Sequence, residues 1–396
     1  MSYYVLASRT AEGLQRLLKI VKSNCDKLKW RISVKKSQII SPEDRVVWTV
    51  VEEDGTTSIS LKKVLEYKYL GIQTGGSYYQ TRQNWQKRAV DAANKYKWCC
   101  MRFSKLGPDR VLLGIMAWTA AAVPSILFGC ETLPIADKYI DDIERTQATL
   151  AKYLLGLPPS APNILVQTEL GIQYFRHKLY SQVLNYYTRV LLMENTRWPK
   201  LALDEHLRRP ASSQYFKFIN KIRTEVGFKE APLTKKYLQE SLYNHFLMKV
   251  NSHISRMSQI GLRPLTKFEK QNYVCENKAA ETIAKFRLNR VNLGRIVPRE
   301  NHRVQNKCPL CPPAIPMYQN TPYHIVMECN SLKEIKKVTG LNNYLNLSIL
   351  NGVSPIETYR NYLDGVGLDG KEVTRKVILL RGETLQTVVD YYLSRW

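Results

Sequence analysis

The chain of 396 residues contains 44% hydrophobic and 23% charged residues, a composition that can bury a core and that excludes a largely disordered polymer. Lysine and arginine number 59 against 34 aspartates and glutamates, so the formal net charge is +25. A surplus of this size favours a polyanionic partner, because each phosphate that a cation contacts releases condensed counterions. An ordinary basic surface with no such partner stays open as an alternative.

The sequence carries no signal for a membrane or for an oxidising compartment. No run of about 20 apolar residues is present, and the first residues, MSYYVLASRTAEGL, lack the basic start and apolar core of a signal peptide. Most of the eight cysteines are scattered, which suits a reducing compartment better than a disulfide framework. We therefore expect an intracellular protein, nuclear or cytoplasmic, with no membrane partner and no small-molecule substrate. The sequence leaves the oligomeric state open.

The first 75 residues predict a small α+β unit. Residues 8–30 repeat leucine and valine at helical spacing, with lysine and arginine on the other face. A short strand is expected in WRISVKKSQII, residues 30–40. Two or three further strands are expected in residues 45–72, around a turn at Asp54–Gly55.

From residue 76 the pattern is helical, so the fold class is predicted as mostly α. Glycine and proline pairs separate the first helices, and Pro124 is expected to kink one of them. A helical tail is expected from about Ser331. The other predicted helices cover residues 84–106, 108–131, 138–157, 168–193, 235–257 and 276–291.

One cluster of residues has the spacing of a metal site. Cys308, Cys311, His324 and Cys329 form the pattern C-x2-C-x12-H-x4-C. Two cysteines two residues apart can direct both sulfurs at one ion, and a loop of about a dozen residues can bring a second pair round to close a tetrahedron. Three thiolates and one imidazole suit Zn²⁺, and four protein ligands indicate a structural site. His302 remains an alternative to His324.

Just before this cluster the chain is strongly basic. Residues 285–307 carry seven lysines and arginines against the single acid Glu300, a composition typical of a phosphate-tracking surface. A solvated helix face is the alternative. The candidate contacts are Lys285, Arg287, Arg290, Arg295, Arg299 and Arg303.

Several stretches, taken in order, resemble the C-terminal part of LINE-type (non-long-terminal-repeat) retrotransposon reverse transcriptases. LKWRISVKKSQII (28–40) is similar to a conserved motif of that family, and EYKYLGI (66–72) to its primer-grip hairpin. ILFGCETLPI (126–135), DIERTQATLAKYLLGLPPSAP (142–162) and TELGI (168–172) resemble its thumb and post-thumb helices. The zinc pattern lies where many of these elements carry a zinc knuckle. The resemblance covers about residues 1–335.

The resemblance implies roles for several residues. Lys36 matches a lysine that assists proton delivery to pyrophosphate, with Lys35 as the neighbouring alternative. Lys87, Arg88 and Lys95 would lie on a thumb helix along the template–primer duplex. The primer grip would comprise Tyr67, Tyr69, Leu70 and Gly71, which could equally form an ordinary strand end before a turn.

The family's Tyr-x-Asp-Asp motif would fall at or before MSYYVLAS, which contains no aspartate. We therefore expect no polymerase activity from this chain alone, and a need for Mg²⁺ only if another chain supplies the palm aspartates. The expected domains are a palm remnant (1–75), a thumb-like helical bundle (76–204), a helical basic linker (205–300), a CCHC zinc knuckle (301–335) and a helical tail (336–396).

The expected function is binding of RNA, an RNA–DNA hybrid or DNA by the C-terminal part of a reverse transcriptase. The main alternative is a structural scaffold whose basic charge is incidental. A polymerase completed by a partner chain is a third hypothesis.

Overall fold

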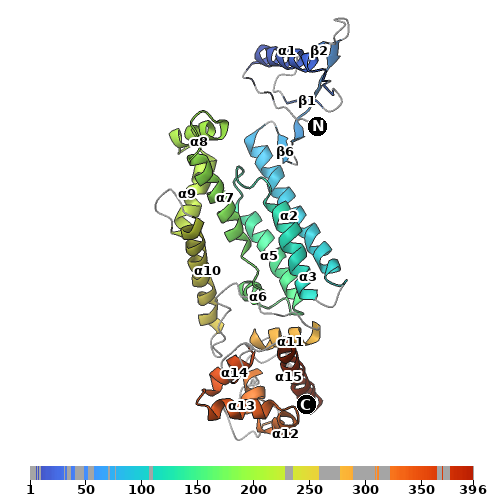
Figure 1. The fold of residues 1–396 in the computed structure, drawn as a ribbon, viewed down its shortest axis with the longest axis vertical. Coiled ribbons are helices and arrows are strands. Elements are labelled where there is room, and N and C mark those ends of the chain that lie inside the picture. The colour runs from blue at the N-terminus through green and yellow to red at the C-terminus, as the bar shows by residue number, and fades with distance from the viewer. Residues whose placement is uncertain are drawn as a thin grey trace, which may run out of the picture. The chain divides into compact units, whose positions relative to one another are not determined.

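The structure is a computed structural model. It describes residues 6, 8, 10–30, 32–33, 37–40, 49–51, 58–69, 72–75, 77–106, 110–227, 235–257, 277–288, 308, 310–311, 322–363, 368 and 375–395. These residues divide into two compact units, Met1–Arg88 and Ala89–Trp396 (Figure 1). The described part of the chain is mostly helical, as the sequence predicts.

The first unit packs one amphipathic helix against short strands. Helix α1 (Ala11–Lys27) begins at Thr10, whose hydroxyl accepts a hydrogen bond from the Gly13 N–H and so satisfies one of the free donors of the first turn. Leu14 and Leu18 of this helix pack against Ile39 and Leu61, which are buried. This small apolar cluster holds α1 to the strands.

The strands that the structure describes in the first unit form three two-stranded pairs. β1 (Gln38–Ile39) pairs in parallel with β4 (Lys62–Lys63), and β2 (Thr49–Val51) pairs antiparallel with β3 (Ser58–Ser60). β5 (Glu66–Tyr69) and β6 (Ile72–Gly75) form a hairpin. The expected turn at Asp54–Gly55 lies outside the described residues, but the pairing of β2 with β3 agrees with strands on either side of it.

Helix α2 (Tyr78–Phe103) runs from the first unit into the second, which is a helical bundle followed by a smaller group of helices. The bundle comprises α3 (Arg110–Ala117), a π-helical turn (Trp118–Ala122), α4 (Val123–Leu127), α5 (Asp137–Leu154), α6 (Asn163–Glu169), α7 (Phe175–Leu191), α8 (Trp198–Arg208), α9 (Gln214–Val226) and α10 (Lys235–Met257).

The expected kink at Pro124 takes the form of the π-helical turn. The Val123 N–H donates to the Trp118 carbonyl, five residues back rather than four. Proline has no N–H to continue the α-helical ladder, and its ring crowds the preceding turn, so one wider turn relieves both effects. The helix therefore continues past Pro124 with a local expansion.

The sequence pattern also predicts one helix over 168–193, and this prediction is wrong. α6 ends at Glu169 and α7 begins at Phe175. Between them Gly171 has φ +62°, in the left-handed region that ends many helices, and the Ile172 N–H bonds back to the Gln167 carbonyl at 3.0 Å. The break lets α7 turn back and pack against α5.

A buried chain of amide hydrogen bonds ties the bundle together. Trp118 is fully buried and its indole N–H donates to Gln147 Oε1 at 2.9 Å. The Gln147 amide in turn donates to Gln167 Oε1 at 2.7 Å. These bonds join the π-helical turn, α5 and α6, and each satisfies a polar group that would otherwise be costly to bury.

Among the described residues, one segment, Arg110–Leu127, is long and apolar enough to cross a membrane by length and composition alone. The expectation that no such segment exists is therefore too strict. In this structure the segment packs within the bundle, where Gly114 lies against Leu154 and Trp118 bonds to Gln147.

The smaller group of helices completes the second unit. Its elements are α11 (Asn277–Arg287), a π-helical turn η3 (His324–Glu328), a short 3₁₀ turn η4 (Asn330–Leu332), α12 (Lys333–Val338), α13 (Leu341–Leu350), α14 (Pro355–Leu363) and α15 (Arg375–Arg395). α11 packs along α15, where Thr282 donates to Gln386 Oε1 at 2.7 Å. The described residues after Ser331 are thus mostly helical, as expected.

Candidate metal centre

The four predicted metal ligands lie together. One ligand atom from each of Cys308, Cys311, His324 and Cys329 lies within 4.8 Å of all the others. Cys311 Sγ is 3.3 Å from His324 Nε2 and 3.8 Å from Cys329 Sγ, which is 4.0 Å from Cys308 Sγ. Tetrahedral zinc bound to sulfur and nitrogen separates its ligand atoms by roughly 3.5–3.8 Å. The sulfurs are too far apart for a disulfide, which needs about 2.05 Å.

Two local structures bring the four ligands together. The Cys311 N–H bonds back to the Cys308 carbonyl at 3.4 Å in a tight turn, which directs both sulfurs to one side. His324 starts the π-helical turn η3, and the Cys329 N–H closes it on the His324 carbonyl at 2.8 Å. Ser331 joins the two halves by donating to the Leu310 carbonyl at 2.5 Å. The spacing H-x4-C is thus realised by a five-residue π turn.

The imidazole is oriented for metal binding. His324 is 1% exposed, and its Nδ1 lies 3.2 Å from the Glu328 carboxylate. A carboxylate at Nδ1 holds the proton there and leaves the Nε2 lone pair directed at the sulfurs. Ile325 and Val326, from the same π turn, are fully buried and shield this side from water.

The three thiols have different pKa values. Hydrogen bonds, first from Cys329 and then from His324, lower the pKa of Cys308 to about 3. The pKa of Cys329 is raised, first by its hydrogen bond to Cys308, then by burial and by the negative charge of its neighbours. The pKa of Cys311 is also raised, chiefly by burial. A divalent cation removes the penalty on ionising the second and third thiols, so the cluster favours binding one.

A buried lysine completes the centre. Lys336 is 3% exposed, and its ammonium donates to the Cys329 carbonyl at 3.2 Å. Burial lowers its pKa to about 8, against the opposing pull of the neighbouring thiols. A divalent ion held by three thiolates would carry a net charge of −1, and this ammonium would supply a compensating charge beside it. Sequence spacing did not identify Lys336, since nothing in the cysteine pattern marks a residue seven positions beyond it.

The expected nucleic-acid contacts divide between described and undescribed residues. Lys87 and Lys95 are exposed on α2, whereas Arg88 is half-buried and burial lowers its pKa. In β5, the carbonyl of Tyr67 accepts from the Thr74 hydroxyl at 2.7 Å across the hairpin, and Tyr69 pairs with Ile72. The candidates that lie outside the described residues are Lys36, Leu70, Gly71, Arg290, Arg295, Arg299 and Arg303, together with the alternative ligand His302.

The structure corrects the interpretation of Arg287. This arginine is 3% exposed, and its Nε donates to Glu169 at 2.5 Å in a buried ion pair between α11 and α6. Its guanidinium is buried in this ion pair and is not part of a phosphate-binding surface. Its neighbour Lys285 is half-buried, with its ammonium 3.7 Å from Glu281.

Asp141 and Asp142 are used as ion-pair partners within the bundle. Asp141 lies 2.7 Å from Arg176 and Asp142 pairs with Arg145.

Comparisons of the chain with family models, with curated proteins and with solved structures find no match.

Proposed function

We propose that the chain is a nucleic-acid-binding protein whose C-terminal part folds around a structural zinc ion. The observation that carries the proposal is the convergence of Cys308, Cys311, His324 and Cys329 on one point. Four protein ligands fill a tetrahedral shell and leave no position for water or substrate. The ion would therefore stabilise the fold, joining the turn at Cys308 to η3 and thence to α12.

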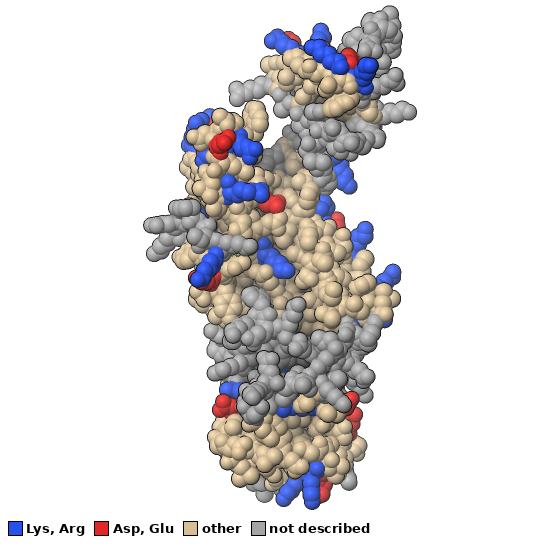
Figure 2. Space-filling model, in the orientation of Figure 1, with Lys and Arg blue, Asp and Glu red and all other residues tan. Residues whose placement is uncertain are grey.

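Charge supports a nucleic-acid partner. The chain has a net charge of +25, and exposed cations occur on more than one element of the second unit, as Figure 2 illustrates over α8. Arg208 and Arg209 there are more than three-quarters exposed, and Lys95 is exposed on α2. Such cations attract phosphates over several ångströms even where an acid lies nearby.

The order of elements supports a more specific hypothesis, in which the chain is similar to the C-terminal part of a LINE-type reverse transcriptase. The hairpin β5–β6 would act as the primer grip, and the helices from α2 to α7 as a thumb. Lys36, Tyr67 and Tyr69 would then lie near a primer end. On this hypothesis the preferred partner is RNA or an RNA–DNA hybrid, with duplex DNA second, and Mg²⁺ would act only with palm aspartates from another chain.

Salt dependence of binding tests the proposed function. The zinc-loaded chain is titrated into labelled RNA, RNA–DNA hybrid and duplex DNA at several salt concentrations. Contacts with several phosphates predict that log K falls steeply and linearly with log[salt]. The slope of this line becomes steeper by close to one for each phosphate neutralised. Absent or nearly salt-independent binding would favour the alternative, a scaffold whose charge is incidental.

A further inference from the structure

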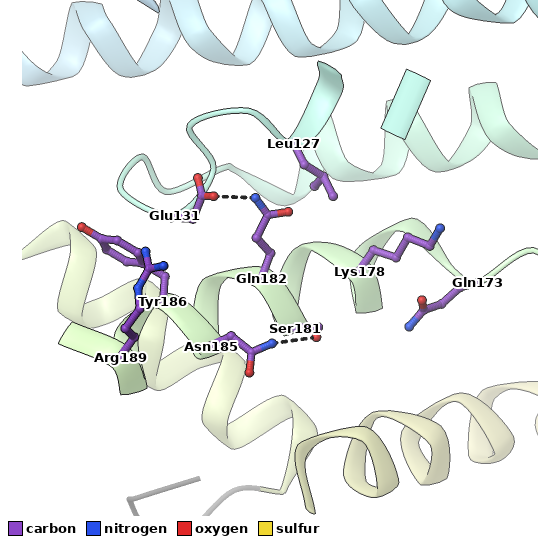
Figure 3. A pocket seen from close by; sticks show the side chains of 9 residues that line it. All are labelled: Leu127, Glu131, Gln173, Lys178, Ser181, Gln182, Asn185, Tyr186 and Arg189. Atoms are coloured by element: carbon purple, nitrogen blue, oxygen red, sulfur yellow. Dashed lines mark hydrogen bonds between the residues drawn. The ribbon is translucent and has the colours of Figure 1, made fainter. Parts of the chain in front are cut away.

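A polar pocket of about 520 Å³ lies beside α7 in the second unit (Figure 3). Its walls come from α7 and the loop before it, and from the end of α4 with the turn that follows. Pockets of 300–1,000 Å³ are typical for small molecules, so this one can hold a nucleotide-sized group. The metal centre described above shares none of its residues.

The pocket follows one face of α7. Lys178, Ser181, Asn185 and Arg189 recur at intervals of three or four residues, which places them in a row about 16 Å long. The opposite face of the helix carries Leu179 and its buried apolar neighbours, which fix the helix in the bundle. A rigid helix thus presents a row of polar groups to the pocket.

Lys178 occupies one end of this row. Its side chain is half-buried, and burial lowers the pKa of its ammonium. Within the described part of the chain, the structure gives this ammonium no hydrogen bond or ion pair. A partly desolvated cation that lacks an anion gains more from binding one than an exposed lysine does, because water has already been removed.

The other end and the middle of the pocket suit a nucleotide. Arg189 lies over the ring of Tyr186, with 5.3 Å between the guanidinium and the ring centroid, and it is exposed. Gln182 donates to Glu131 at 2.5 Å, which engages the pocket's carboxylate and fixes both groups (Figure 3). The amides of Asn185 and Gln173 can donate to and accept from base edges, and an arginine–tyrosine pair offers a surface on which a base can stack.

The helix that follows α7 offers a further stacking group. Helix α8, which contacts α7, begins at Trp198, whose side chain is 84% exposed. Arg197 precedes it and is exposed. An indole left in water beside a cation is a common platform for an unpaired base.

We propose that this pocket binds a short segment of single-stranded nucleic acid, with one backbone phosphate at Lys178 and the next contacts at Arg189 and Tyr186. The inference rests on the proposed nucleic-acid binding and adds a specific site and strand type to it. A duplex is too wide for a pocket of this size, whereas a single strand can place its phosphates and bases along the α7 row.

The test measures binding of a fluorescein-labelled 12-residue oligouridylate, and of its deoxy counterpart, to the zinc-loaded full chain. K178Q and R189Q should each weaken binding about tenfold, the loss expected for one charge-assisted hydrogen bond. K217Q is the matched control, since Lys217 is exposed on α9 and does not line the pocket. It makes the same charge change and should weaken binding less than about threefold.

A crosslinking arm locates the strand. An oligonucleotide with 4-thiouridine is expected to crosslink to a peptide of α7 that contains Tyr186, and K178Q should reduce the yield. Among the described residues the Lys178 ammonium has no hydrogen-bonded or ionic partner to lose, so K178Q should melt at the wild-type temperature, which separates lost binding from lost folding.

The possible results are distinguishable. If the wild type binds with a steep salt dependence, but K178Q and R189Q match K217Q and crosslinks fall elsewhere, the pocket assignment is wrong and the proposed function stands. If uridine monophosphate binds as tightly as the oligonucleotide, the pocket is a mononucleotide site and the strand assignment is wrong. If no nucleic acid binds the wild type, both proposals fail.

Discussion

His177 and His245 face each other inside the second unit, with Nε2 of the first 3.0 Å from Nδ1 of the second. They join α7 to α10, and His177 is 1% exposed. Burial is the largest cause that lowers the pKa of His177 to about 3, and the nearby charges of His245, Lys249 and Arg176 lower it further. The pKa of His245 is also lowered, chiefly by burial. One ring must donate and the other accept, so the hydrogen bond is lost when both rings are protonated, and burial disfavours a charge on either ring.

This pair predicts that the protein loses stability as the pH falls. The unfolded chain takes up a proton on His177 near pH 6.5, whereas the folded chain resists it to about pH 3. The stability is therefore fully present above pH 6.5 and falls between these values, by up to about 1.4 kcal/mol per pH unit from this residue. Denaturant titrations from pH 8 to pH 4 measure the slope.

The matched variant for this prediction is H177Q, which keeps a hydrogen-bonding side chain that does not titrate. Its free energy of unfolding should vary less with pH than that of the wild type over the same range. Carboxylates that titrate in this window contribute equally to both proteins, so equal slopes would show that His177 is not the source.

Lys336 is predicted to support metal binding. K336M leaves the net charge of −1 on a zinc–thiolate centre without its buried counter-charge. Loss of such an outer partner typically weakens metal affinity about 10–100-fold. Competition with a chromophoric chelator measures the zinc affinity, and K337M, one residue along α12, provides the control. Equal affinities in the two variants would contradict the role assigned to Lys336.

The buried pair of Arg287 and Glu169 is predicted to hold α11 to the bundle. R287M leaves a carboxylate that is 3% exposed without its partner, which costs about 3–5 kcal/mol of unfolding free energy. The double variant R287M/E169M should recover most of that loss because no charge then remains buried. Denaturant unfolding measures both.

Lys285 provides a control for the Arg287 variants on the same helix. Its ammonium is 3.7 Å from Glu281 and the side chain is 34% exposed, so K285M should change stability by less than about 1 kcal/mol. A loss in K285M as large as that in R287M would contradict the distinction drawn between these two cations.

The sequence predicted the metal cluster well, because its geometry is local. Two tight structures suffice to bring Cys308, Cys311, His324 and Cys329 together, and both are set by the spacing of the ligands themselves. The residues that support the ligands could not be predicted from the sequence. The position of Lys336 depends on how α12 leaves Cys329, which no spacing rule describes.

Helices were predicted more reliably than their ends and their buried partners. The expected helix over 138–157 corresponds to α5, whereas the one over 168–193 ignored the break that Gly171 makes. The basic run at 285–307 predicts Arg287 as a surface cation, because a charge run carries no information on burial. Its partner Glu169 lies 118 residues away, a pairing that only the tertiary fold creates.

Zinc content of the intact protein tests the central claim most directly. Native mass spectrometry of the wild-type chain after purification in zinc should show one ion per chain, and C311S should show none. The control C99S replaces an exposed cysteine outside the cluster and should keep the ion. The account predicts one equivalent of zinc in the wild type and in C99S, and none in C311S. An undiminished equivalent in C311S would show that these four residues do not form the metal centre.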